Sequence, residues 1–246
     1  MNSISDRISI GEREVHVWFA PVPPDPGAER EAWAVLSLEE QARARALRQH
    51  HDRAVQVRTR ALVRRVLATY LHVAPQEVTI AAGREGKPEV VVDVDTPESP
   101  RFNVSHSGSM ALVALSTSHE VGADLEQVRG GLVWHDIADK FFSPAELDAI
   151  RVVPQADQRR AFYDCWVRKE AYLKGLGVGL RRSTTDFTVP VVGAGGPVED
   201  LGISSRRHGQ PWYVYGLDIE RGFAASLAVD GQVAVTIRPW PSLTGL

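Results

Sequence analysis

Alternation of apolar and polar positions predicts strands in several parts of the chain. Residues 15–22 (VHVWFAPV) alternate and are rich in valine and aromatic residues, which is typical of a strand. Residues 101–108 (RFNVSHSG) predict a short strand that enters a turn, and residues 110–117 (MALVALST) predict a strand buried on both faces. Three closing strands are expected at residues 212–219, 223–229 and 232–240.

Helical spacing fills the segments between these strands. Residues 31–71 carry apolar positions at helical intervals, and Ser37 with Glu40 three residues later is a capping-box pattern that starts a helix. The second capping pattern combines Ser143 as N-cap with proline at the first helical position and glutamate at the third. Residues 159–177 predict a long helix that ends in glycine. Loops are expected at residues 21–28 and 190–200, which are rich in proline and glycine.

The order of these elements suggests a duplicated unit. A strand, helices and strands are followed by helices and strands again, and FNVSHSGSMALVALS is loosely echoed by PWYVYGLDIERGFAASLAV. We therefore predict an α+β fold with two similar halves, residues 1–121 and 122–246, each a small, mostly antiparallel sheet with packed helices.

Composition limits the classes of function. Hydrophobic residues make up 43% and charged residues 24% of the 246 residues, which is ordinary for a globular protein. A net charge of −3 gives no overall positive field to attract nucleic acid or a membrane surface. Cys165 is the single cysteine, which excludes an internal disulfide and a multi-cysteine metal site. The start has no signal-peptide pattern and no long apolar run occurs, so we expect a cytoplasmic protein.

Two segments place a pair of carboxylates two residues apart, VGADLEQVR with Asp124 and Glu126, and YGLDIERGF with Asp218 and Glu220. Residues i and i+2 of a strand point to one face, roughly 6.5 Å apart. Such a pair repels itself unless a cation lies between the carboxylates, and Mg²⁺ suits one or two carboxylates together with substrate phosphates. The plain alternative is a solvated edge of a sheet.

The helix WVRKEAYLKG places Glu170 and Lys174 one turn apart, with Trp166 and Leu173 expected in the core. The pair could be an ordinary surface ion pair, but its neighbours are apolar, and a partly buried pair of charges costs desolvation. A third carboxylate with an ammonium group would complete a magnesium–phosphate site.

Two short turns add groups that suit an anion. Ser105 and His106 lie in NVSHSG, and Lys87 lies on the rigid turn GKP. Taken singly, each of them is a weak signal, and a lone histidine after a strand is more often structural.

In this order, GREGKP, FNVSHSG, VGADLEQVR, FFSPAEL and WVRKEAYLKGLGVGL resemble a phosphopantetheinyl transferase of the surfactin-synthetase-activating (Sfp) type. The resemblance runs from about residue 37 to about residue 190. It implies two subdomains in pseudo-twofold relation with the active site in the cleft between them. It also implies transfer of the 4′-phosphopantetheine arm of coenzyme A to a serine of an apo acyl, polyketide or peptidyl carrier protein, with release of 3′,5′-ADP.

The resemblance assigns roles to residues of this chain. Mg²⁺, with Mn²⁺ as an alternative ion, would be held by Asp124, Glu126 and Glu170. Glu170 would also be the general base toward the carrier serine, directly or through water, and Lys174 would assist the departing 3′,5′-ADP. Coenzyme A as co-substrate would be bound by Arg43, Lys87, Ser105, His106, Lys169 and Lys174.

The chain departs from the family pattern at two places. The acidic motif reads Gly-Ala-Asp-Leu-Glu in place of the usual Gly-Ile-Asp-Ile-Glu, which changes packing volume in the core and leaves the ligands as they are. Leu47 stands where an aromatic residue often follows the basic segment, so Arg45 rivals Arg43 for the contact with the 3′-phosphate.

Residues 130–142 are expected near the carrier protein. Arg129, Leu132, Val133 and Trp134 would form a docking patch, although the apolar three could equally be core residues under a loop. We expect a monomer with no nucleic-acid or membrane partner.

Two other functions compete with this one. One is an inactive carrier-binding scaffold of the same fold, and the other is a different magnesium-dependent phosphoryl or nucleotidyl transferase. Only the first acidic pair leads into a helix with a third carboxylate and a lysine, so Asp124 and Glu126 are the expected ligands, and Asp218 and Glu220 a solvated turn.

Overall fold

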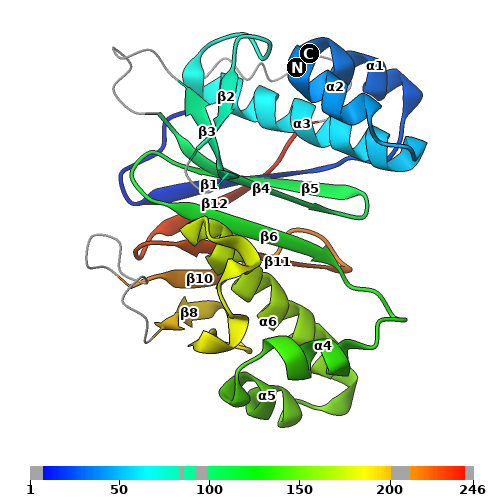
Figure 1. Ribbon diagram of the computed structural model, residues 1–246. Helices are drawn as coiled ribbons and strands as arrows, with labels where there is room; N and C mark the ends of the chain where they lie inside the picture. Colours follow the sequence, from blue (N-terminus) through cyan, green and yellow to red (C-terminus); the bar gives the residue numbers. More distant parts are fainter. Residues whose placement is uncertain (1–7, 84–85, 92–98, 201–210, 242–246) are drawn as a thin grey trace.

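Four layers make up the fold in the computed structural model, which describes residues 8–83, 86–91, 99–200 and 211–241. Helices α1 to α3 cover one face of a first sheet, and a second sheet packs against the other face (Figure 1). Helices α4 to α6 cover the far side of the second sheet (Figure 1). The fold class is the predicted α+β class.

The N-terminal part of the chain supplies the first helical layer and most of the first sheet. Its elements are β1 (Glu14–Pro21), α1 (Pro26–Val35), α2 (Leu38–Arg45), α3 (His50–Leu71), β2 (Thr79–Ala82), β3 (Pro88–Val91), β4 (Arg101–Ser107) and β5 (Met110–Ser116).

The C-terminal part supplies the second sheet and its helices. Its elements are β6 (Val121–Gln127), α4 (Trp134–Phe141), α5 (Pro144–Arg151), α6 (Gln155–Leu176), the 3₁₀ turns η2 (Gly179–Arg181) and η3 (Thr184–Asp186), β7 (Phe187–Thr188), β8 (Gly195–Pro197), β9 (Glu199–Asp200), β10 (Tyr213–Gly216), β11 (Phe223–Val229) and β12 (Ala234–Pro239).

Both predicted capping boxes are confirmed. The backbone N–H of Glu40 donates to the Ser37 hydroxyl (3.2 Å), and the Glu40 carboxylate accepts from the Ser37 backbone N–H (3.0 Å). Ser143 and Glu146 repeat this arrangement at the start of α5. Helix α6 ends, as expected, at a glycine, Gly177, whose positive φ of 75° suits a C-cap.

The two predicted loops are shorter than expected. Helix α1 begins inside residues 21–28, because the Asp25 side chain accepts from the backbone N–H groups of Gly27 and Ala28 and so caps a helix that starts at Pro26. Residues 190–200 contain strand β8, which pairs with β10, and β9, which pairs with β7. Strand β8 (GGP) was not predicted, because its glycines are more typical of a loop than of a strand.

The two four-stranded sheets have the orders β12-β1-β5-β4 and β6-β11-β10-β8. Their strands pair antiparallel except β1 and β12, which run parallel. Each sheet and its covering helices include a strand, a 22-residue helix and a hairpin in the same chain order. These are β1, α3 and β4–β5 for the first sheet, and β6, α6 and β10–β11 for the second. The last strand, β12, returns to the first sheet although it lies in the predicted second half. The division at residue 121 stays a prediction.

Alternation along β5 explains why this strand is buried on both faces. Its even-numbered residues face the second sheet, and its odd-numbered residues face α3. Strand β6 follows the same rule: Ala123 and Leu125 lie in the core between the sheets, which leaves Asp124 and Glu126 together on the opposite face. The predicted orientation of this strand is confirmed.

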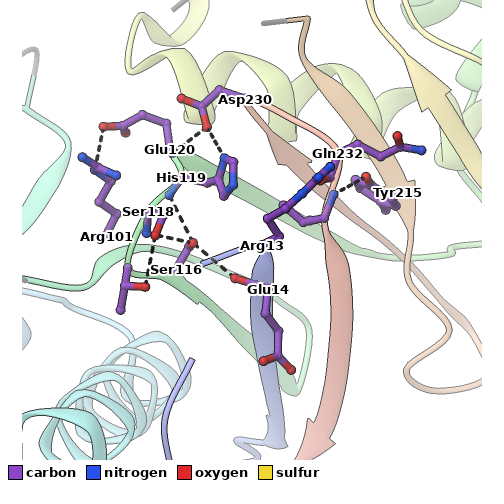
Figure 2. A network of polar contacts seen from close by, with 12 residues as sticks. Arg13, Glu14, Arg101, Ser116, Ser118, His119, Glu120, Tyr215, Asp230 and Gln232 are labelled. Carbon is purple, nitrogen blue, oxygen red and sulfur yellow. Dashed lines mark hydrogen bonds and ion pairs between the residues drawn. The ribbon is translucent and has the colours of Figure 1, made fainter. Parts of the chain in front are cut away.

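Polar contacts tie the passage from β5 to β6 to the end of β11 (Figure 2). Asp230 Oδ1 accepts from the backbone N–H of Glu120 (2.9 Å) and lies 3.1 Å from His119 Nδ1. Arg101 Nε lies 3.3 Å from the Glu120 carboxylate, and the Ser116 hydroxyl accepts from the His119 backbone (3.2 Å). These contacts fix the point at which the chain passes from one sheet to the other.

Among the residues that the structure describes, no helix combines the length and the apolar character needed to cross a membrane.

A chain of hydrogen bonds connects α3 to strands β1 and β12 of the first sheet. The Trp18 indole donates to the Tyr70 hydroxyl (2.8 Å), which therefore donates to His16 Nδ1 (2.7 Å). His16 Nε2 faces the Glu14 carboxylate (3.0 Å), which also accepts from Thr236 (2.7 Å). Burial lowers the pKa of His16 and raises the pKa of Tyr70 to about 12. The network thus holds His16 neutral, with its proton on Nε2.

We expect this network to make the protein less stable in acid. Because the pKa of His16 is lower in the folded chain, the unfolded chain binds more protons once the pH falls through about 6.5, the ordinary histidine pKa. The free energy of unfolding, measured with urea between pH 7.5 and 5.5, should therefore decrease as the pH falls. This decrease should be smaller in His16→Gln. His51→Gln, at an exposed histidine, should keep the full dependence. An equal dependence in both variants would contradict this assignment.

Candidate functional site

The edge strands β4 and β6 lie side by side where the two sheets meet, and side chains of β4 bond the free backbone edge of β6. The three contacts keep a constant offset of 20 residues: Ala123 N to Asn103 Oδ1 (2.9 Å), Leu125 N to Ser105 Oγ (3.3 Å) and Gln127 N to Ser107 Oγ (3.1 Å). We call these contacts the β4–β6 seam. The seam fixes the register between the sheets without a backbone ladder.

The seam serines also hold the first acidic pair. Ser105 donates to Asp124 Oδ1 (2.9 Å), and Ser107 donates to Glu126 Oε2 (2.7 Å). Lys174 Nζ reaches the same Asp124 oxygen (2.6 Å) and the Ser105 hydroxyl (3.0 Å). Asp124 is only 4% exposed, and its buried Oδ2 has no hydrogen-bond partner among the described residues. This oxygen is therefore an acceptor that the described residues leave unsatisfied.

A cavity of about 510 Å³ opens at the seam, between α3, β4, β6 and α6. It brings together six of the predicted site residues: Ser105, His106, Asp124, Glu126, Glu170 and Lys174. Trp166 also lines it, while its ring packs against Phe142 and Phe162 of the core as the helical spacing predicted.

The carboxylates in the cavity repel one another. Burial raises the pKa of both Glu126 and Glu170, and the negative charge of Asp124 adds to the rise in each case. The charge of Lys174 opposes both shifts. A cation bound among these groups would relieve the repulsion.

The donor set fits a divalent cation that also binds substrate phosphates. In the described part of the chain, no three acidic, histidine or cysteine side chains form a ready metal cluster. Mg²⁺ is usually held by one or two carboxylates plus waters and phosphate oxygens, and not by an all-protein cage. The unpartnered Oδ2 of Asp124 and the mutual repulsion of the carboxylates are the features that favour such an ion.

Helix α3 contributes three cavity residues that the sequence analysis missed, Gln56, Thr59 and Arg60. The Thr59 hydroxyl is buried and has no partner among the described residues. Burial lowers the pKa of Arg60, and the charge of nearby Arg43 lowers it further. Their shared signal is the i, i+3, i+4 spacing, which places all three on one face of the helix.

A second cavity of about 530 Å³ adjoins the first one, sharing Gln56 and His106 with it. Arg129 and Leu47 lie in its wall. Partial desolvation of the His106 ring, helped by the charges of Lys174 and Arg60, lowers the pKa of this histidine. A neutral imidazole thus stands at the junction of the two cavities.

Two predicted coenzyme A ligands lie away from the cavity. Lys169 is 1% exposed and pairs with Glu146, at 2.7 Å from both carboxylate oxygens. Lys87 Nζ donates to Glu120 (3.0 Å) and to the backbone carbonyls of Val121 (2.9 Å) and Gly175 (3.1 Å). Each lysine has partners for its three N–H groups, and Lys87 also lines a separate cavity of about 520 Å³. The contacts of both lysines with coenzyme A stay predictions.

The basic residues of α2 lie on the surface. Arg43 pairs with Glu39 one turn away and is exposed, although it is close enough to influence Arg60. Arg45 lies over the Trp33 ring at 5.3 Å. Neither residue lines a described cavity, so the contact of Arg43 with coenzyme A stays a prediction.

The predicted docking patch is only partly a surface. Trp134 is 8% exposed and stacks on His135 (3.6 Å) above Phe162 in the core. Leu132 is half-buried against the same core, whereas Val133 is 65% exposed and Arg129 is exposed. Trp134 is therefore a core residue, which was the stated alternative, and Val133 is the accessible apolar residue.

The second acidic pair lies in the turn between β10 and β11. Asp218 and Glu220 are exposed there, as expected for a solvated turn.

A close approach of β6 to α6 brings the acidic pair to the lysine. A Cβ atom added to Gly122 would lie 2.0 Å from the carbonyl oxygen of Ala171 and 2.2 Å from the backbone nitrogen of Gly175. Only glycine fits at this contact, because both obstructing atoms belong to the backbone. The Gly of the acidic motif thus sets the distance between Asp124 and Lys174.

Comparison with known proteins finds the same family in both halves. Residues 24–118 match the family described as "4′-phosphopantetheinyl transferase, N-terminal", and residues 120–228 match the 4′-phosphopantetheinyl transferase superfamily. The chain is 32% identical to the Nostoc 4′-phosphopantetheinyl transferase HetI over 69% of this chain and 71% of HetI. A Synechocystis protein that is provisionally named a 4′-phosphopantetheinyl transferase is 35% identical over 67% of this chain and 65% of that protein. Sfp of Bacillus subtilis is 30% identical over 52% of this chain and 54% of Sfp.

We expect Gly122→Ala to lower the free energy of unfolding by about 2 kcal/mol or more, because the added methyl group must push β6 away from α6. Urea unfolding measures this change. Gly131→Ala is the matched control, since a Cβ atom there meets nothing within 4 Å. Equal stability of the two variants would show that the close contact is not required.

Proposed function

The chain belongs to the 4′-phosphopantetheinyl transferase superfamily, and from this we propose that it moves the 4′-phosphopantetheine arm of coenzyme A to a serine of an apo carrier protein, with Mg²⁺ and release of 3′,5′-ADP. One observation carries the proposal. Asp124 and Lys174 meet at the β4–β6 seam, in a cavity that also contains Glu126, Glu170 and Arg60. Carboxylates for a divalent cation and cations for phosphates are the two sets of groups that such a transfer needs.

Asp124, Glu126 and Glu170 would hold Mg²⁺, or Mn²⁺ in its place. The bound ion would neutralise charge on the pyrophosphate of coenzyme A. Asp124 has one oxygen engaged by Lys174 and Ser105 and the other unpartnered, so it can bind an ion without losing its orientation.

Lys174, Arg60, Ser105 and His106 would bind the phosphates of coenzyme A. The Lys174 side chain is 31% exposed, so it can exchange its contact with Asp124 for a phosphate oxygen and stabilise the leaving 3′,5′-ADP. Arg43 would add positive charge at the rim.

Glu170 would accept the proton of the carrier serine, directly or through water. Burial and the charge of Asp124 raise the pKa of Glu170, which makes it a stronger base than an ordinary surface carboxylate. Its two proposed roles, ion ligand and base, both follow from its place in the cavity.

The carrier would approach the face that carries Arg129 and Val133. Arg129 lines the second cavity and, as a cation, would attract acidic side chains of the carrier. We propose that the reaction takes place in the cytoplasm. A single chain would suffice for it, because residues from both sheets of one chain line the cavity.

Asp124→Ala should reduce magnesium-dependent loading by at least about 100-fold, because it removes an ion ligand and the partner of Lys174. The measurement is the mass gain of an apo carrier domain incubated with coenzyme A and Mg²⁺. Asp218→Ala, the exposed counterpart, should load carriers largely as the wild type does. EDTA should stop loading and added Mg²⁺ should restore it. Near-normal turnover by Asp124→Ala would refute the assignment.

Val133→Ser should raise the KM for the carrier by roughly 4-fold, the equivalent of about 0.8 kcal/mol for one buried CH₂ group, and leave the KM for coenzyme A unchanged. Val192→Ser is the control, since Val192 is similarly exposed (61%) and lies outside the patch. If both variants behave alike, Val133 is not part of the docking surface.

A further inference from the structure

Lys169 is one of the most completely enclosed charges in the described part of the chain. Its side chain is 1% exposed, and the Glu146 side chain opposite is 0% exposed. Two ammonium N–H groups face the Glu146 oxygens (2.7 Å each), and the third donates to the Phe187 carbonyl (2.9 Å). Nothing of this lysine is left to meet a substrate.

The Glu146 carboxylate gathers three separate segments. Besides Lys169 it accepts from the backbone N–H of Ser143 at the start of α5 (2.8 Å) and from that of Val189 after β7 (2.8 Å). The Ser143 hydroxyl in turn lies 2.9 Å from the Thr188 hydroxyl. Helix α6 is thereby tied at one point to α5 and to the strand that follows the 3₁₀ turns.

Such a pair is a poor device for stability alone. Burial lowers the pKa of Lys169 against the attraction of Glu146, which shows the desolvation that the charged form must overcome. Well-packed apolar residues of similar volume are often as stabilising as a buried ion pair. A fully bonded polar network does, however, select one arrangement, because any other leaves a buried charge unpaired.

The arrangement that this network selects determines where Glu170 points. Lys169 and Glu170 are consecutive on α6, so their side chains leave the helix about 100° apart. Glu170 lines the cavity, while Lys169 faces Glu146 on the other side. The contacts of Lys169 with Glu146 therefore fix how α6 is rotated about its axis at the turn that carries Glu170.

We propose that Lys169 and Glu146 form a positioning pair that orients Glu170 in the active site, and that Lys169 does not bind coenzyme A. This inference rests on the proposed transferase function. In phosphoryl-type transfer a misplacement of about 1 Å can cost about 100-fold in rate, so an interaction that orients a carboxylate can matter as much as a ligand.

The test compares Lys169→Met and Glu146→Gln with Arg160→Met, which makes the same kind of change at an exposed ion pair of α6. Folding is checked by circular dichroism, and carrier loading gives kcat and the KM for coenzyme A. We expect folded Lys169→Met and Glu146→Gln to lose about 10- to 100-fold in kcat, while the KM for coenzyme A changes by less than about 3-fold. Arg160→Met should stay close to wild type.

The double variant Lys169→Met/Glu146→Gln tests whether the two residues act as a pair. Its loss in kcat should be close to that of either single variant, because breaking the pair once removes its effect. Additive losses would overturn the pairing. A large rise in the KM for coenzyme A with kcat preserved would show that Lys169 binds the substrate after all.

Three outcomes remain distinct. A folded variant with wild-type kcat overturns the positioning role and leaves the transferase function intact. If Lys169→Met does not fold, Glu146→Gln, which keeps side-chain volume and one acceptor oxygen, decides the question by the same kcat criterion. If the wild-type protein loads no carrier under the same conditions, the proposed function fails, and the inference fails with it.

Discussion

The edge of strand β6 is the constraint on which the arrangement of the two halves depends. An unpaired row of backbone N–H groups at a buried sheet edge is costly, and here the side chains of Asn103, Ser105 and Ser107 satisfy it in place of a neighbouring strand. The spacing of two along β4 matches the spacing of two along β6, so the register between the sheets has one solution. Two sheets that share one core are thus joined at a defined offset.

The same contacts place the chemistry. Because the Ser105 and Ser107 hydroxyls accept from the β6 backbone, they are oriented to donate to Asp124 and Glu126, one carboxylate each. A site built this way lies where the two sheets meet, and its carboxylates are held close enough to repel one another. The same serine hydroxyls therefore satisfy the backbone edge of β6 and orient the carboxylates of the site.

The sequence predicted features that depend on local physics. Both capping boxes, the burial of β5 on both faces and the shared face of Asp124 and Glu126 follow from the local sequence pattern, and all are confirmed. Features that depend on what packs opposite could not be predicted in this way. The sequence suggests a surface position for Trp134, because its contact with Phe162 is not visible there. The polar face of α3 becomes a cavity wall only because β4 lies opposite it.

The lysines on and next to α6 differ in their contacts, although the sequence analysis gave all of them the same expected role. Lys87 donates to the Gly175 carbonyl at the end of the helix, and Lys169 is enclosed with Glu146 in its middle. Between these points Gly122 brings β6 against the helix backbone. Lys174, partly exposed and sharing Asp124 with a serine, has a partner that a phosphate could replace. Charge and spacing identify all three lysines as candidates, but the ability to exchange a partner is a property of the packed structure, and spacing alone cannot show it.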